Sequence, residues 1–169
     1  MKMKKAIIIG ATSGIGKSMA EFLLREGFVV GVTGRREELF QSIKTQISSK
    51  IVCKKMDVQD LSNLESICNE LVNHLGGLDL LIFSAGIGEE NKNLNFDVEN
   101  SIIKTNIQGF TCIADWAVRC FKEQGYGHLV NISSIAGIRG NGIAPSYNST
   151  KAYQINYLEG LRINVNHYG

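Results

Sequence analysis

Short apolar runs alternate with amphipathic helical segments along the whole chain. Five runs have the length and composition of buried strands, at residues 4–10, 28–33, 51–56, 79–84 and 127–133. Helical spacing of apolar residues predicts helices over 14–27, 36–48, 60–75, 97–124 and 147–166. Strands and helices in this order form a doubly wound parallel sheet with right-handed crossovers. The predicted fold is therefore α/β, a single domain over residues 1–169 with three layers, α/β/α.

Capping residues mark the helix boundaries. Gly27, Gly76 and Gly125 each follow a predicted helix, where glycine favours the C-terminal cap. Asp60 or Ser62 is the expected N-cap of the helix over 60–75.

Composition excludes several classes of protein. Hydrophobic residues make up 44% of the 169, enough for one core. The net charge is +2 with no basic stretch beyond residues 2–5, so we expect no nucleic-acid partner. The first apolar run is too short for a signal peptide, and no run is long enough for a membrane span. The four cysteines lack C-x-x-C spacing, so we predict reduced thiols in a cytoplasmic protein without a metal site.

A glycine-rich turn separates the first strand from the first helix. Gly10, Gly14 and Gly16 have the spacing G-x-x-x-G-x-G, and Thr12 and Ser13 add hydroxyl groups. Such a turn lets a pyrophosphate approach the N–H groups of a helix N-terminus. The alternative is an ordinary glycine-rich turn. Because ligands of doubly wound sheets bind beyond the carboxyl ends of the strands, we expect a dinucleotide here.

The residues after the second and third strands bear on cofactor choice. Residues 33–36 read T-G-R-R, where NAD-binding folds usually place a carboxylate for the ribose 2′-hydroxyl. Arg35 and Arg36 can instead bind a 2′-phosphate bidentately, or are solvated charges at a helix start. We therefore predict NADP, with NAD possible. Asp57 can accept a hydrogen bond from the adenine amino group beside the backbone of Val58, or is a helix-entry aspartate.

Tyr147 and Lys151 are four residues apart, so they share one face of the last predicted helix. A free phenol has a pKa near 10, but an ammonium about 5 Å away stabilises the phenolate by roughly 3 kcal/mol. A phenol in that position can exchange a proton with an alkoxide or alcohol, and the lysine can reach the nicotinamide ribose. Ser134, at the end of the fifth strand, can hold the substrate oxygen. The alternative is a solvent-facing helix pair.

Asn106 and Gly109 are poor helix formers in the middle of the long predicted helix. One interpretation is a local distortion whose freed carbonyl holds a water that links Lys151 to solvent. The other is an exposed amide on a tolerant helix.

These motifs resemble the short-chain dehydrogenase/reductase family along the whole chain. Residues 9–16 are similar to its Thr-Gly-x-x-x-Gly-x-Gly motif, and residues 127–134 to its G-x-x-V-N-I-S-S segment. The resemblance implies a Rossmann-type fold and NAD(P)-dependent interconversion of an alcohol and a carbonyl in a small molecule. It also implies a homodimer or homotetramer that assembles through the helices over 97–124 and 147–166. The implied catalytic residues are Asn106, Ser134, Tyr147 and Lys151. The implied cofactor-binding residues are Gly10, Thr12, Ser13, Gly14, Ile15, Gly16, Arg35, Arg36, Asp57, Val58, Ser84, Ala85, Gly86, Tyr147 and Lys151.

The sequence departs from the family pattern in two places. Ile9 replaces the usual threonine, and residues 83–86 read F-S-A-G where the family has Asn-Asn-Ala-Gly. Ser84 forms fewer hydrogen bonds than an amide, so we expect modestly altered cofactor affinity. The family usually continues with further strands and a substrate loop, so we expect either part of a longer protein or a shortened one. The strand over 127–133 would then be an exposed sheet edge.

The sequence thus predicts an NADP-dependent oxidoreductase with Tyr147 as the acid/base group. The alternative is a catalytically impaired NAD(P)-binding protein that acts as a binding or interaction module. An epimerase that uses Tyr147 and Lys151 with tightly held NAD is disfavoured by Arg35 and Arg36.

Overall fold

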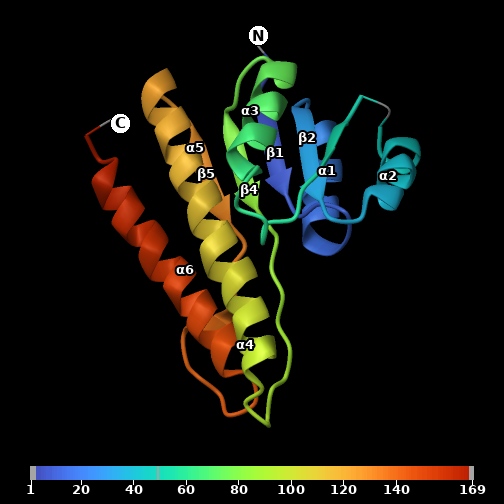
Figure 1. Ribbon diagram of the computed structural model, residues 1–169. Helices are drawn as coiled ribbons and strands as arrows, with labels where there is room; N and C mark the ends of the chain where they lie inside the picture. The colour runs from blue at the N-terminus through green and yellow to red at the C-terminus, as the bar shows by residue number, and fades with distance from the viewer. Residues whose placement is uncertain (1–2, 49, 168–169) are drawn as a thin grey trace.

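The computed structural model describes residues 3–48 and 50–167 and contains a five-stranded parallel sheet in the order β3-β2-β1-β4-β5 (Figure 1). This order confirms the predicted doubly wound fold, because the chain moves outward from β1 in both directions. The strands are β1 Lys5–Ile9, β2 Val29–Gly34, β3 Val52–Lys55, β4 Leu80–Phe83 and β5 His128–Asn131. The α-helices are α1 Gly14–Arg25, α2 Phe40–Gln46, α3 Leu64–Leu75, α4 Phe96–Ile103, α5 Phe110–Gln124 and α6 Pro145–Asn164.

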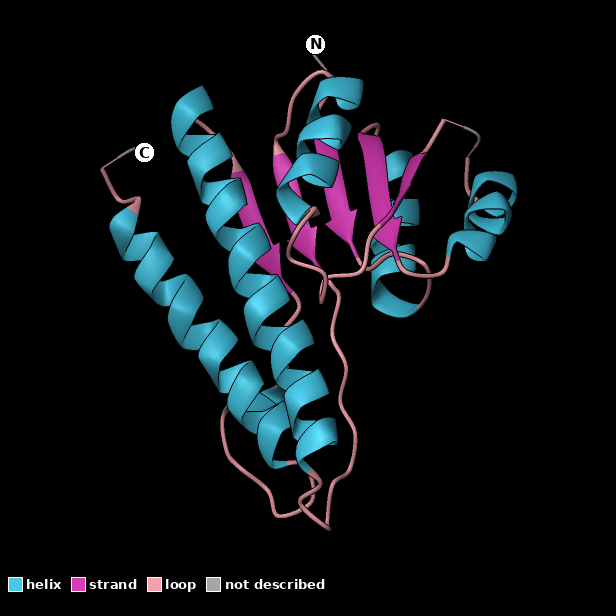
Figure 2. Cartoon of the chain, viewed as in Figure 1, coloured by secondary structure: helices cyan, strands magenta, loops and turns pink. Residues whose placement is uncertain are grey.

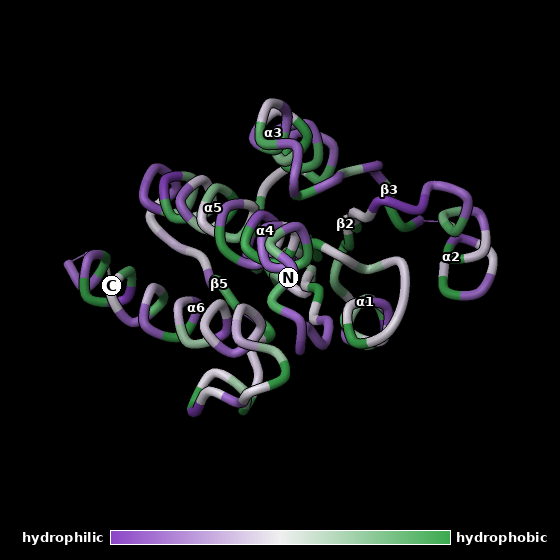
Figure 3. The backbone as a smooth tube through the Cα atoms, turned by 60° about the horizontal axis from the view of Figure 1, so that its bottom comes forward, coloured by the Kyte–Doolittle hydropathy of each residue, from purple (hydrophilic) through white to green (hydrophobic). Residues whose placement is uncertain are grey.

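The two faces of the sheet are covered by different helices. Successive residues of β1 point to opposite faces, so Ala6 and Ile8 pack in the cluster that includes residues of α1 and α2. Ile7 and Ile9 pack in the other cluster, which includes residues of α3 and α5. Figure 3 shows α1 and α3 on opposite sides of the sheet. The predicted three layers are therefore present, and they explain why β1 is apolar on both faces.

Three helices differ from the prediction at their N-terminal ends. The helix expected over 36–48 begins as a 3₁₀ turn, η1 Glu37–Leu39, before α2. The carboxylate of Asp60 accepts hydrogen bonds from Ser62 and Asn63 in a turn before α3, so the N-cap is Asn63 rather than Asp60 or Ser62. The last helix starts at Pro145 rather than at 147, because proline fits the first turn of a helix, where its missing N–H has no helical partner.

The long helix predicted over 97–124 is interrupted by a π-helical segment, η2 Lys104–Gly109, between α4 and α5. It ends as predicted, with Gly125 in the left-handed conformation, and Gly76 ends α3 in the same way. Gly27 also has a positive φ, directly after the C-cap residue Glu26 of α1.

The carboxyl ends of the strands all lie on the same side of the molecule, and α4 and the first half of α6 extend beyond them (Figure 2). The loops that follow the five strands therefore meet below the sheet, beside the N-terminal half of α6. Among the described residues β5 pairs only with β4, as expected for an edge strand. Within the same part of the chain, no helix is both long enough and apolar enough to cross a membrane.

Candidate active site

A cavity of about 800 Å³ opens at the carboxyl ends of the strands. Its lining comes from the segments that follow all five strands and from the first turns of α6. Of the predicted site residues, fourteen line it. They are Gly10, Thr12, Ser13, Gly14, Ile15, Arg35, Arg36, Asp57, Val58, Ser84, Ala85, Gly86, Tyr147 and Lys151. The predicted residues Gly16, Asn106 and Ser134 are not among the lining residues.

The glycine turn leaves one side open toward this cavity. Gly14 has a positive φ of 58°, and an added Cβ there would meet nothing within 4 Å. Gly16 has no room for a side chain, since a Cβ on it would lie 2.3 Å from the carbonyl oxygen of Gly10. Gly16 therefore lets α1 pack directly on the turn, while Gly14 leaves the helix N-terminus accessible to a ligand.

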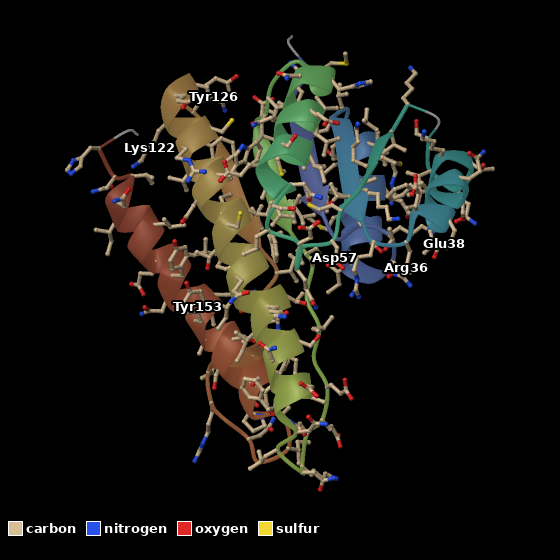
Figure 4. All side chains as sticks on the ribbon, in the orientation of Figure 1. Arg36, Glu38, Asp57, Lys122, Tyr126 and Tyr153 are labelled. Atoms are coloured by element: carbon tan, nitrogen blue, oxygen red, sulfur yellow. The ribbon has the colours of Figure 1, made fainter. Side chains whose placement is uncertain are left out.

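Arg36 is fixed beside the glycine turn. Its Nη2 donates hydrogen bonds to the hydroxyl oxygens of Thr12, at 3.1 Å, and Ser13, at 2.6 Å. These contacts hold an exposed guanidinium at the mouth of the cavity, next to the end of β2. Arg36 and Asp57 lie at the same end of the sheet (Figure 4). This end of the cavity therefore presents a positioned cation with a planar set of donors.

Asp57 lies in the turn after β3, seven residues before the first residue of α3, so it is not a helix-entry residue. One carboxylate oxygen accepts a hydrogen bond from the backbone N–H of Gln59, at 3.0 Å. The side chain is exposed, whereas Val58 is buried. The turn thus presents both a carboxylate and the adjoining backbone to the cavity.

Tyr147 and Lys151 lie together at the other end of the cavity. The Nζ atom of Lys151 is 5.8 Å from the centroid of the Tyr147 ring. Lys151 is only 4% exposed, so the solvent-facing helix pair is the wrong interpretation. Its ammonium donates to the backbone carbonyl of Ile132 and to Oε1 of Gln154, both at 3.1 Å. Burial lowers the pKa of Lys151, because the charged form loses solvation.

Asn106 is fully buried within the π-helical segment, so the exposed-amide interpretation is wrong. Its side chain accepts from the N–H of Ile87 and donates to the carbonyl of Ile87 and to the hydroxyl of Thr150, at 2.8–3.0 Å. These bonds tie the loop after β4 to α6. The helix distortion is therefore confirmed, and the backbone carbonyl of Asn106 accepts from Nε2 of Gln154, at 2.9 Å. The water at this carbonyl stays a prediction.

The two serines after β5 face different partners. Ser133 lines the cavity, and its hydroxyl donates to the backbone carbonyl of Lys151, at 3.2 Å. Ser134 is the N-cap of the short 3₁₀ helix η3 Ile135–Gly137, where its Oγ accepts from the N–H of Ala136, at 3.1 Å. The Oγ of Ser134 is thus held as the acceptor of a capping bond, and its O–H is left to donate to a substrate oxygen.

A carboxylate from α4 holds the N-terminus of α6. Glu99 accepts hydrogen bonds from the backbone N–H of Ser146, at 3.1 Å, and from the Ser146 hydroxyl. The buried amide of Asn91 donates to the same side chain, at 2.5 Å. A carboxylate stabilises a helix N-terminus by satisfying a free N–H and by its charge. Glu99 therefore anchors the turn that carries Tyr147.

Besides Glu99 and Ser133, several other residues of this site were not predicted from the sequence. Gly88 lies against the ring of Tyr147, since an added Cβ would be 2.6 Å from Cδ2 of that ring. Glu89 and Glu90 line the cavity beside it. Gln154 contacts the ammonium of Lys151. A polar residue three positions after Lys151 on the same helix face was the available signal for Gln154.

The cysteines take no part in the cavity. All four are free, and Cys68 is completely buried, which raises the pKa of its thiol. Among the described residues, no group of three or more His, Cys, Asp or Glu side chains could hold a metal ion.

Known proteins with similar sequences include several oxidoreductases. The sequence model of the short chain dehydrogenase family matches residues 4–169. An uncharacterized oxidoreductase of Staphylococcus aureus strain USA300 is 36% identical over 164 residues, which cover 94% of this chain and 70% of that protein. An uncharacterized oxidoreductase of Myxococcus xanthus is 30% identical over 98% of this chain and 67% of its own length.

Two solved structures are also similar. ElxO with NADP bound is 29% identical, with a TM-score of 0.91 over 99% of this chain and 70% of ElxO. A variant of the actinorhodin polyketide ketoreductase with NADPH is 25% identical, with a TM-score of 0.91 over 96% of this chain and 65% of the ketoreductase. With a family match over nearly the whole sequence, this chain belongs to the short-chain dehydrogenase family of oxidoreductases.

Proposed function

We propose that this protein is an NADP-dependent oxidoreductase that interconverts an alcohol and a carbonyl in a small molecule. The observation that carries the proposal is the pairing of Tyr147 with the buried ammonium of Lys151 at one end of a cavity whose other end is the glycine turn. ElxO binds NADP and the polyketide ketoreductase binds NADPH, which supports the choice of cofactor.

The residues present fit a dinucleotide phosphate. Gly14 leaves the N-terminus of α1 open to a pyrophosphate, and Arg36 lies beside Thr12 and Ser13 where a 2′-phosphate would be bound. Asp57 and Val58 would contact the adenine, and Ser84–Gly86 would border the dinucleotide near the middle of the sheet. When bound, the cofactor supplies or accepts the hydride.

Tyr147 is the proposed acid/base group. In the reducing direction its hydroxyl donates a proton to the oxygen of the carbonyl that is being reduced, and in the oxidising direction the phenolate accepts that proton. Lys151 places a buried positive charge 5.8 Å from the centroid of the Tyr147 ring, where it would stabilise negative charge that develops in the reaction. Ser134 would hold the substrate oxygen by its hydroxyl, while Asn106 fixes the loop after β4 against α6.

Replacing Tyr147 with phenylalanine tests this mechanism. We expect Tyr147→Phe to lower the NADPH-dependent turnover of a carbonyl panel by about 10²- to 10⁴-fold. NADPH binding, followed by fluorescence, should change less than about threefold, because the ring itself is kept. Turnover equal to that of the wild type would reject the mechanism.

Two further comparisons separate the alternatives. Ser134→Ala should lower turnover more than Ser133→Ala if Ser134 holds the substrate oxygen, and the reverse order would assign that role to the cavity-lining Ser133.

Wild-type protein that binds NADPH but reduces no member of the panel would favour a cofactor-binding module over an enzyme. The proposed assembly, a homodimer or homotetramer through the helical segment from α4 to α5 and through α6, is checked by sedimentation.

A further inference from the structure

Gln154 is a buried side chain that joins three elements behind the cavity. It lies on α6 and is 0% exposed. Its Nε2 donates to the backbone carbonyl of Asn106 in η2, at 2.9 Å. Its Oε1 accepts from Nζ of Lys151 and from Nδ2 of Asn131 at the end of β5, both at 3.1 Å. Both ends of the amide are therefore occupied.

The chemistry of the partners fixes the orientation of this amide. An ammonium only donates hydrogen bonds and a backbone carbonyl only accepts them. The oxygen of Gln154 must therefore face Lys151 and its nitrogen must face Asn106. A flipped amide would place two donors together and two acceptors together in a buried site, where unpaired polar groups are costly.

The π-helical segment explains why the carbonyl of Asn106 is available. A π-helix replaces the i→i+4 hydrogen bonds of an α-helix with wider ones, so some main-chain groups lose their usual partner. Gln154 supplies a donor to the Asn106 carbonyl. The same side chain thus satisfies the distorted helix and holds the ammonium that lies below Tyr147.

We propose that Gln154 is a positioning residue for the Tyr147–Lys151 pair, in which its amide bridges Lys151 and the Asn106 carbonyl. The catalytic role given to Gln154 rests on the proposed function. The hydrogen bond by which Gln154 holds Lys151 does not depend on that function and can be measured without turnover. Through its oxygen Gln154 stabilises the charged lysine, which opposes the effect of burial.

Several ionisable groups share the cavity with this ammonium. Tyr147 faces it from the first turn of α6, and Glu89 and Glu90 line the cavity from the loop after β4. Arg35, Arg36 and Asp57 line the cofactor end. The groups that accept hydrogen bonds from Lys151, the carbonyl of Ile132 and the amide of Gln154, are both neutral. Replacing Gln154 with an apolar residue therefore removes the nearest dipole and leaves the charges in the cavity unchanged.

Two substitutions with opposite expected signs test the proposal. Gln154→Met keeps the approximate volume and removes the amide, so the titration midpoint of Lys151 should fall by about one pH unit. Gln154→Glu places a carboxylate beside the ammonium, so the midpoint should rise by about one unit. Both midpoints are measured on the protein without cofactor, from the ¹³Cε signal of labelled lysine, assigned with Lys151→Arg. Tyr153→Phe is the matched control, because it removes only the neighbouring hydrogen bond to Thr111 and should leave the midpoint unchanged.

Activity provides the second measurement. In Gln154→Met the kcat for carbonyl reduction should fall about tenfold and its pH profile should move, while the NADPH dissociation constant changes less than threefold. Midpoints of Lys151 that are the same in wild type, Gln154→Met and Gln154→Glu would overturn the proposal, whatever the activities. If wild type reduces no carbonyl yet the midpoints move as stated, the proposed function fails and the hold on Lys151 stands. If Gln154→Met does not fold, the upward shift in Gln154→Glu decides alone.

Discussion

Gly88 lies so close to the proposed acid/base group that one methyl group should disturb the site. A Cβ at this position would be 2.6 Å from Cδ2 of Tyr147 and 2.9 Å from Cε2. Ordinary contacts begin near 3.4 Å, so the ring and the loop must separate by about 0.8 Å. Gly88 does not have a positive φ, so the backbone itself accepts alanine. A misplacement of about 1 Å costs about 100-fold in rate, and since the loop takes up part of the shift, we expect kcat in Gly88→Ala to fall about 10- to 100-fold.

The effect should be confined to the end of the cavity near Tyr147. NADPH binding should change less than about threefold in Gly88→Ala, because the glycine turn and Arg36 are untouched. Gly140→Ala is the matched control, since Gly140 is exposed and an added Cβ meets nothing within 4 Å. The ring itself can be followed in ¹³C-tyrosine spectra, in which the Tyr147 signals should move in Gly88→Ala alone. Wild-type kcat together with unmoved Tyr147 signals would refute the reasoning.

Three other perturbations act on separate parts of the structure. Arg36→Ala should weaken NADPH binding about tenfold but NADH binding less than twofold, because only NADPH has the 2′-phosphate; equal losses in fluorescence titrations would contradict this. Glu99→Ala should lower the free energy of unfolding in urea by about 1–2 kcal/mol, since the N–H and hydroxyl of Ser146 lose their acceptor. An unchanged urea midpoint of unfolding would contradict the stabilising role of Glu99 at the N-terminus of α6. Burial raises the pKa of the Cys68 thiol, so the native state keeps a proton that the unfolded chain loses above about pH 8.5. Stability should therefore fall at higher pH by up to about 1.4 kcal/mol per pH unit from this group, and Cys68→Ala should show a shallower decline in urea titrations at pH 7 to 10.

The sheet was predictable from sequence because each strand is a short apolar run between helical segments. Ile7, Ile8 and Ile9 show the principle, since a run of three β-branched residues fits only a strand that is covered on both faces. The chain order then leaves few topologies, as parallel connections are nearly always right-handed. The residues after the strands, from Gly10 to Tyr147, come together at the cavity for the same reason.

What could not be predicted depends on contacts between distant elements. The break at η2 is only hinted at by Asn106, because whether a helix widens depends on which groups lie beside it. The side chain that meets the Asn106 carbonyl, Gln154, comes from 48 residues further along the chain. Likewise, no local pattern links Glu99 with Ser146, since that contact exists only once α4 and α6 are packed together.

The π-helical segment also decides which partner the carbonyl of Asn106 can take. Deleting one residue from 104–109 would return this turn to regular α spacing and leave α4 and α5 nearly in phase, because a π turn holds about one residue more than an α turn. Phe110, which packs on Phe83 and Tyr157, and Ile102, which is buried on α4, could then both keep their places. The carbonyl of Asn106, however, would regain a helical partner and lose its bond to Gln154. Such a deletion should therefore keep the fold but release the residue that holds Lys151, whereas deletions in the exposed stretch around Gly140 and Gly142 should leave that contact unchanged.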